Sequence, residues 1–187
     1  MTEKEKMLQG ELYYPERDDT LKKERLYCKS LCHKYNLIPP DEVDLRKETI
    51  GKIIKTKENF WIEPSFWCDY GYNIEIGENF YSNHNLVILD PASVKFGDNV
   101  FIGPNCGFYT AEHPIDYKTR NEGLEYAKPI TVGNNVWFGG NVTVLGGVNI
   151  GNNVVIAAGA TVTKDVPDNC IIAGVPAKII KQLGNLK

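Results

Sequence analysis

Apolar residues recur every six positions in the C-terminal half of the chain. The repeat runs from Val132 to Val166 and holds six times in register. The heads of the hexads are Val132, Phe138, Val144, Ile150, Ile156 and Val162, and the second apolar positions are Val136, Val142, Val148, Val154, Ala160 and Val166. A period of six is neither the stripe of an amphipathic helix nor the alternation of a single strand. It is typical of a hexapeptide β-solenoid, in which three hexads, about 18 residues, make one triangular coil.

Turn residues mark the predicted corners of these coils. Gly-Asx-Asn triplets stand at residues 97–99, 133–135 and 151–153, and a weaker form of the repeat begins near Ile74. Gly, Asn and Asp tolerate left-handed backbone angles, which tight corners require. The spacing of the triplets therefore predicts equivalent turns stacked on one another.

Two segments depart from the repeat and divide the chain. Residues 1–58 carry apolar residues at helical spacing, which predicts a helical cap with one helix beginning near Asp19 and a second from about Asp41 to Lys55. We expect the solenoid over residues 59–176 and a tail over 177–187. Residues 110–130 form a polar insertion within the solenoid, and long insertions in compact domains are commonly functional.

Composition excludes several classes of function. The 187 residues carry a net charge of −3, so no broad basic surface is available for nucleic acid. No run approaches the ~20 apolar residues of a membrane span. The charged N-terminus lacks an apolar signal core, and the five cysteines form no disulfide pattern, which together favour the cytoplasm.

Two groups of residues suggest chemistry. Cys28, Cys32 and His33 are close in sequence, but tetrahedral zinc needs a fourth ligand that nothing nearby supplies, so no metal is expected. His113 heads the polar insertion, and histidine suits general base catalysis near neutral pH. A base needs an orienting acceptor on its other ring nitrogen. Three carboxylates of the insertion are candidates, of which we favour the first: Glu125, Asp116 and Glu112.

Six motifs carry a resemblance to a known family. They are residues 69–77 (DYGYNIEIG), 79–85 (NFYSNHN), 113–114 (HP), 129–140 (PITVGNNVWFGG), 159–167 (GATVTKDVP) and 173–178 (AGVPAK). With the helical leader, the chain resembles the maltose/galactoside O-acetyltransferase branch of the hexapeptide-repeat acyltransferases. The resemblance implies a left-handed parallel β-helix with an N-terminal helical cap. It also implies a homotrimer with active sites at subunit interfaces, acetyl-CoA as co-substrate and a small sugar as acceptor.

The resemblance also implies roles for individual residues. His113 would be the catalytic base. The acceptor contacts would be Arg25, Asp69, Tyr81, Asn83 and Asp90, with Glu16 or Asp18 from the leader. The coenzyme contacts would be Gly140, Ala158, Thr163, Lys164, Lys178 and Lys181. Some relatives have Ser in place of Gly140 and Arg in place of the last two lysines. Lysine offers phosphate a point charge where arginine offers a two-pronged fork. Trp137 falls at an outward hexad position, which predicts a place in the coenzyme site or in a subunit contact.

These residues predict direct acetyl transfer to a sugar hydroxyl, since no Ser or Cys stands in a nucleophile motif. Three alternatives remain open. A γ-type carbonic anhydrase would need three histidines on one zinc, whereas the predicted solenoid holds only His84 and His113. A solenoid scaffold would lack the catalytic insertion. A xenobiotic O-acetyltransferase would share the chemistry and differ in its acceptor pocket.

Overall fold

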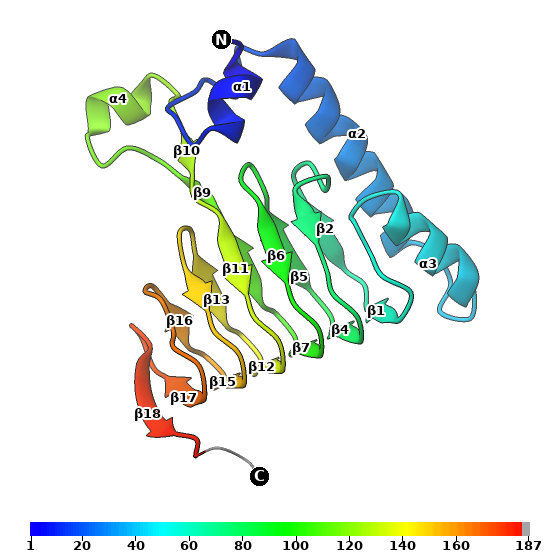
Figure 1. Ribbon diagram of the computed structural model, residues 1–187. Coiled ribbons are helices and arrows are strands. Elements are labelled where there is room, and N and C mark those ends of the chain that lie inside the picture. The colour runs from blue at the N-terminus through cyan, green and yellow to red at the C-terminus, as the bar shows by residue number, and fades with distance from the viewer. Residues whose placement is uncertain (185–187) are drawn as a thin grey trace.

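The computed structural model describes residues 1–184 of the chain, and short parallel strands stack into a solenoid flanked by helices (Figure 1). The last three residues of the predicted tail, 185–187, lie outside the described part. The hexapeptide prediction of a mainly β solenoid with a helical N-terminal region is confirmed.

Three sheets form the sides of the triangular coils. The first contains β1 (Phe60–Ile62), β4 (Phe80–Ser82), β7 (Val100–Ile102), β12 (Val136–Phe138), β15 (Val154–Ile156), β17 (Cys170–Ala173) and β18 (Lys178–Gln182). The second contains β2 (Phe66–Cys68), β5 (Leu86–Leu89), β8 (Gly107–Tyr109), β13 (Thr143–Leu145) and β16 (Thr161–Val162). The third contains β3 (Ile74–Glu75), β6 (Val94–Phe96), β11 (Ile130–Val132) and β14 (Asn149–Ile150).

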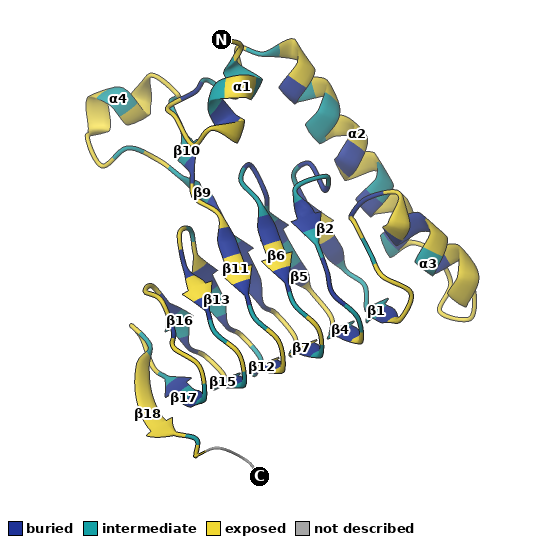
Figure 2. Ribbon diagram, in the orientation of Figure 1, coloured by how far each residue is buried: buried dark blue, intermediate teal, exposed yellow. Residues whose placement is uncertain are grey.

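Inward-facing residues fill the solenoid as one continuous apolar column. Every apolar hexad position predicted between Val132 and Val166 is buried. In Figure 2, dark buried residues recur on strand after strand on either side of an exposed central residue, as on β6 and β11. Four phenylalanines stack edge to face along the axis, with centroid separations of 5.3, 4.9 and 5.2 Å: Phe80, Phe96, Phe108 and Phe138. A single coil cannot bury its own inner face, so the stack as a whole stabilises each turn.

Coil length varies along the stack. Phe60 pairs with Phe80 in the first coil, Val136 pairs with Val154 further along, and Val154 pairs with Cys170 in the last coil. The separation between partners along the chain therefore shortens from the first coil to the last. The second coil is as long as the first, since Trp61 pairs with Tyr81 and Tyr81 with Phe101, so the expectation of three full hexads is wrong for the first two coils and for the last. Extra or missing residues fall in the corners, so the inward register of the strands is preserved.

Asparagines occupy the left-handed positions at the corners. Asn79, Asn99, Asn135 and Asn153 have φ values of 54–57°, as the Gly-Asx-Asn triplets predict. Side-chain amides of successive turns hydrogen-bond to one another, as between Asn79 Nδ2 and Asn99 Oδ1 at 2.8 Å. The corner asparagines thus relieve backbone strain, and several of them, such as Asn79, Asn99 and Asn153, also join neighbouring coils.

The leader folds into three helices: α1 (Glu3–Leu8), α2 (Asp19–Asn36) and α3 (Val43–Gly51). The sequence pattern did not predict α1. The Asp18 side chain caps α2 by accepting from two backbone N–H groups, and the helix begins at Asp19, where it was expected. The second predicted helix is shorter than expected because it closes at Gly51, while Ile53 and Ile54 still pack inward from the turn that follows.

The polar insertion is an arm built on an antiparallel pair. β9 (Ala111–Glu112) pairs with β10 (Tyr126–Ala127), and the short helix α4 (Tyr117–Asn121) lies between them. At the other end, β18 folds back antiparallel on β17, so part of the predicted tail belongs to a sheet. Within residues 1–184, no helix combines the length and apolar character needed to cross a membrane.

Candidate active site

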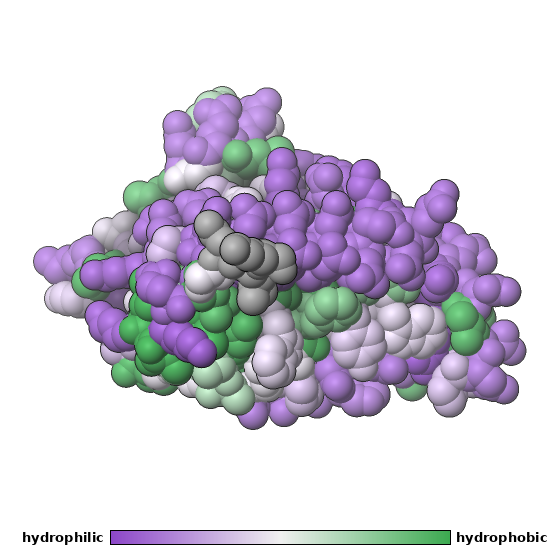
Figure 3. Space-filling view, turned by 60° about the horizontal axis from the view of Figure 1, so that its bottom comes forward, coloured by the Kyte–Doolittle hydropathy of each residue, from purple (hydrophilic) through white to green (hydrophobic). Residues whose placement is uncertain are grey.

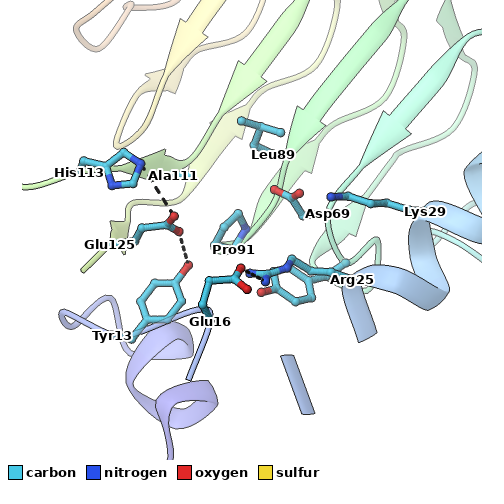
Figure 4. Close-up of a pocket in the computed structure, with 11 residues that line it drawn as sticks. Tyr13, Glu16, Arg25, Lys29, Asp69, Leu89, Pro91, Ala111, His113 and Glu125 are labelled. Atoms are coloured by element: carbon cyan, nitrogen blue, oxygen red, sulfur yellow. Dashed lines mark hydrogen bonds and ion pairs between the residues drawn. The ribbon is translucent and has the colours of Figure 1, made fainter. Parts of the chain in front are cut away.

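A cavity of about 310 Å³ opens where the leader, α2 and the inserted arm meet the coils (Figure 4). This volume is at the lower end of the range for small-molecule pockets, about 300–1,000 Å³. The cavity is lined by Tyr13, Glu16, Arg25, Lys29, Asp69, Tyr70, Leu89, Pro91, Ala111, His113 and Glu125. Residues from five separate segments of the chain therefore form one polar pocket: the start of the leader, α2, the turn after β2, the end of β5 and the arm.

His113 stands at the start of the arm with its ring held in one tautomer. Its Nδ1 lies 3.3 Å from the backbone carbonyl oxygen of Leu124. A carbonyl oxygen can only accept, so in the neutral ring Nδ1 carries the proton and Nε2 keeps a free lone pair. The side chain is 56% exposed, so solvent and substrate can reach it.

Glu125 is the carboxylate that lies beside this lone pair. Its Oε1 is 3.8 Å from His113 Nε2, and its Oε2 accepts a hydrogen bond of 3.1 Å from the Tyr13 hydroxyl. Tyr13 and Glu125 also exchange two backbone hydrogen bonds, of 2.9 and 3.0 Å, which tie the leader to the arm. Burial raises the pKa of Tyr13, so its hydroxyl remains a proton donor.

The two other carboxylates considered as partners of His113 are engaged elsewhere. Asp116 caps α4 through Thr119, and Glu112 pairs with Lys128 at 3.1 Å. The orienting acceptor on Nδ1 is the Leu124 carbonyl, which sequence reasoning could not identify because any residue offers the same backbone group.

Charged side chains from the leader and α2 line the opposite wall. Arg25 of α2 forms an ion pair with Glu16, one of the two leader carboxylates expected as acceptor contacts. Lys29, one turn along α2, extends towards Asp69 in Figure 4. Burial raises the pKa of the Asp69 carboxyl, while Lys29 and Arg25 act in the opposite direction. Three predicted acceptor contacts, Glu16, Arg25 and Asp69, thus share the pocket with His113.

Asp90 supports this pocket from behind and does not face it. Its side chain is fully buried and accepts three backbone N–H bonds, from Asp69 at 3.0 Å, Tyr70 at 2.9 Å and Gly71 at 2.8 Å. The expectation that Asp90 contacts the acceptor is therefore wrong for the pocket of this structure, because the buried carboxylate does not line it. Its carboxylate instead fixes the turn after β2, and so places Asp69. Burial raises the Asp90 pKa to about 7, against the opposing effect of these N–H groups.

Tyr81 and Asn83 lie away from this pocket within the chain. Tyr81 belongs to β4 of the seven-stranded sheet and is in register with Trp61 and Phe101, whereas Asp69 follows β2 of a different sheet. The expectation that Tyr81 and Asn83 share a cleft with Asp69 is wrong within one protomer, because consecutive strands occupy different sides of the triangle.

The predicted coenzyme contacts gather over the last coils. Trp137 projects outward from β12 and is 57% exposed. The Gly159 N–H donates to the Gly140 carbonyl at 2.9 Å, which places the corner of Ala158 directly over that of Gly140. Thr163 and Lys164 lie on the corner after β16, and Lys178 and Lys181 lie on β18; all four are exposed. These residues form an extended outer surface, distinct from the His113 pocket.

Neither solenoid histidine joins a metal cluster. The part of the chain that the structure describes holds one group of three potential ligands within 4.8 Å of one another, and it consists of Cys28, Cys32 and Cys68. His84 is exposed at another corner, where its Nδ1 contacts the Pro64 carbonyl. The three-histidine arrangement of a γ-type carbonic anhydrase is absent from residues 1–184.

Comparison with known proteins agrees with this geometry. Residues 6–57 match the family model of the maltose acetyltransferase hexapeptide capping motif, and residues 129–164 match that of the bacterial transferase hexapeptide with six repeats. The chain is 43% identical over 166 residues to the galactoside O-acetyltransferase of Escherichia coli, covering 88% of this chain and 82% of the relative. The chain belongs to the maltose/galactoside O-acetyltransferase family.

Solved structures of this family superpose on nearly the whole chain. A maltose O-acetyltransferase from Clostridium difficile has a TM-score of 0.95 at 45% identity and covers 99% of both chains. A galactoside acetyltransferase in complex with coenzyme A also has a TM-score of 0.95, at 41% identity, and covers 99% of this chain and 92% of the other. Several groups at the site were not predicted from the sequence, among them Tyr13, Lys29 and the Leu124 carbonyl.

Proposed function

We propose that the protein transfers the acetyl group of acetyl-CoA to a hydroxyl of a small sugar, with His113 as the general base. The observation that carries this proposal is the fixed tautomer of His113. Its Nδ1 proton is held by the Leu124 carbonyl, and its Nε2 lone pair lies beside Glu125 in a polar pocket.

The chemistry follows from that arrangement. Nε2 removes the proton of the sugar hydroxyl while the hydroxyl oxygen attacks the thioester carbonyl. The coenzyme thiolate then leaves and takes a proton from the imidazolium. Glu125 stabilises the imidazolium that exists between these two proton transfers. A positioned base contributes roughly 10²–10⁴-fold to the rate, and holding both substrates together contributes much of the remainder.

The acceptor pocket suits a polyhydroxylated molecule. Arg25 and Lys29 supply donors, and Glu16, Asp69 and Glu125 supply acceptors, around one small cavity. Adjacent hydroxyls of a sugar both donate and accept, so they can satisfy such groups in pairs. An apolar drug alcohol would leave several of these charged groups without partners, at a cost in affinity.

The donor would lie across the outer surface formed by Trp137 and the last coils. Lys164, Lys178 and Lys181 offer positive charge to the phosphates of coenzyme A. That surface borders the seven-stranded sheet, whose outward positions form a ladder of large side chains: Trp61, Tyr81, Phe101, Trp137, Val155 and Ile171.

This ladder also supports assembly into a homotrimer. Figure 3 views the molecule from below Figure 1 and shows a band of apolar and weakly polar residues between hydrophilic margins. Phe101 and Trp137 are 42% and 57% exposed, and exposed apolar patches of this kind commonly mark protein interfaces. In a trimer joined through this face, Tyr81 and Asn83 of one protomer would complete the pocket of a neighbour.

The test is a thiol-release assay with acetyl-CoA and a panel of sugars and drug alcohols. All five cysteines of the protein are buried, so its own thiols add little background. We expect kcat/KM to be largest for a glucoside, maltose or galactoside. The highest kcat/KM for a drug alcohol would favour a xenobiotic acetyltransferase, and no thiol release with any acceptor would favour a scaffold.

Substitution of the base separates catalysis from folding. His113→Ala is expected to lower kcat by roughly 10²–10⁴-fold and to leave acetyl-CoA binding, measured by calorimetry, unchanged. His84→Ala is the matched control, because His84 is also exposed on a corner and lies outside the pocket. Near-normal kcat in His113→Ala would refute the assignment of the base.

A further inference from the structure

Three buried thiols meet beneath helix α2, outside the groups used for acetyl transfer. Cys28 and Cys32 lie one turn apart on α2, and Cys68 ends strand β2 beneath them. Their exposed fractions are 2%, 0% and 3%. The sequence placed only His33 beside Cys28 and Cys32, whereas the fold brings Cys68 there from a distant part of the chain.

The sulfur atoms form a compact triangle. Cys68 Sγ lies 3.4 Å from Cys28 Sγ and 3.8 Å from Cys32 Sγ, and all three sulfurs are within 4.8 Å of one another. A metal–thiolate bond is about 2.3 Å long, so three sulfurs around one ion in a plane are about 4 Å apart. The triangle therefore has the size of a three-coordinate thiolate site and needs only small adjustments to close around an ion.

Burial alone does not explain this convergence. Free cysteines are often buried as small apolar groups, and Cys106 and Cys170 fit that description. Their sulfurs each contact backbone carbonyls, with Cys106 Sγ 3.2 Å from the Gly139 oxygen and Cys170 Sγ 3.2 Å from the Pro167 oxygen. Neither belongs to the cluster of potential metal ligands found among residues 1–184. The two isolated cysteines thus provide an internal comparison for the cluster.

We propose that Cys28, Cys32 and Cys68 form a three-sulfur binding site for a soft monovalent cation, Cu(I). Thiolates select soft ions such as Cu(I). Structural zinc requires four ligands, and the cluster offers three. As metal–sulfur bonds form, thiol protons are released to the solvent.

The site adjoins the acceptor pocket through the backbone. Cys68 precedes Asp69, and Cys28 precedes Lys29, and both of these neighbours line the cavity. An ion held by all three sulfurs would join α2 to the end of β2. Metal loading would therefore fix the distance between the two walls that carry Lys29 and Asp69.

The experiment is an anaerobic titration of the fully reduced, full-length protein against Cu(I) held by bicinchoninate. Loss of the colour of the Cu(I)–bicinchoninate complex measures the transfer of Cu(I) to the protein. A thiolate-to-Cu(I) absorption band in the ultraviolet shows that sulfur is the ligand. We expect one equivalent of Cu(I) per chain. Cys28→Ala and Cys32→Ala should each weaken binding at least about 100-fold, since even second-shell changes cost 10–100-fold.

Matched controls keep the result interpretable. Cys106→Ala and Cys170→Ala should bind Cu(I) as the wild type does, and alanine at positions 28 and 32 suits a helix, so these variants should fold. Thermal unfolding midpoints and circular dichroism spectra of the metal-free variants close to those of the wild type would confirm that they are folded. Stoichiometric binding lost only in the cluster variants supports the site. Absence of binding, binding insensitive to Cys28 and Cys32, or equally tight retention of Zn²⁺ would overturn it.

Discussion

Glu125→Gln tests whether a negative charge beside His113 assists catalysis. The substitution preserves size and shape, and the two backbone hydrogen bonds to Tyr13 do not depend on the side chain. It removes the charge 3.8 Å from His113 Nε2. Two unit charges at this distance attract by about 1 kcal/mol in water and about 4 kcal/mol at an effective dielectric constant near 20.

The exposure of the two groups places the effect towards the lower limit. The His113 side chain is 56% exposed and that of Glu125 is 24% exposed, so solvent screens much of the attraction. A loss of about 1–2 kcal/mol in the transition state corresponds to a kcat/KM lower by roughly 5–30-fold. The KM for acetyl-CoA should not change, because the carboxylate lies in the acceptor pocket.

Steady-state thiol release measures this effect, with Glu122→Gln as the control. Glu122 belongs to the same arm and accepts a 3.3 Å hydrogen bond from Tyr14, but it does not line the pocket. Wild-type kcat/KM in Glu125→Gln would show that the charge plays no part. A loss above about 10³-fold would instead make Glu125 itself the proton acceptor and refute the role given to His113.

Three further predictions concern stability and assembly. Burial raises the Asp90 pKa to about 7, so the folded state holds that proton more tightly than the unfolded state between about pH 4 and 7, and the resulting stability is lost as pH rises. In urea unfolding, the difference in unfolding free energy between the wild type and Asp90→Asn should therefore shrink from pH 4.5 to 7.5. A difference that grows in favour of the wild type would contradict this. Asn99→Ala should lower the unfolding free energy by about 2–3 kcal/mol, because it adds backbone strain at a left-handed position and removes the hydrogen bond from Asn79. Asn99→Gly should lower it by about 1 kcal/mol, because it removes only the hydrogen bond. Equal losses in the two variants would argue against strain. Phe101→Glu should convert a species of three chain masses to one in light scattering, and an unchanged mass would exclude that face as the interface.

The solenoid could be predicted because its packing is periodic. Each apolar position at a hexad head repeats the same environment, so six matches between Val132 and Val162 determine the strands and the corners together. The longer first coil and the shorter last coil could not be predicted, because corners absorb insertions and deletions without changing the inward register. The strand β18 was also missed, since it pairs antiparallel outside the repeat.

The site was predicted where chemistry is carried by distinctive side chains and missed where it depends on distant contacts. His113, Glu125 and Arg25 were identified and do line one pocket. Tyr13 lies 112 residues from Glu125 in sequence, and nothing in the local pattern around it indicates that contact. Asp90 illustrates the opposite error, because a carboxylate that accepts three backbone N–H bonds looks the same in sequence as one that binds substrate.

The position of the pocket follows from where the repeat is interrupted. A regular coil turns its side chains either into the core or along flat outer faces, so it cannot surround a small molecule. The leader before the first coil and the arm after β8 both escape this constraint, and the Tyr13–Glu125 backbone bridge joins them over the end of β2. Segments outside the regular repeat that are positioned by a rigid scaffold are well suited to carry function. The two interruptions therefore bring His113, Glu125, Glu16 and Arg25 to the pocket, while the coils supply a fixed platform and place Asp69 at the turn after β2.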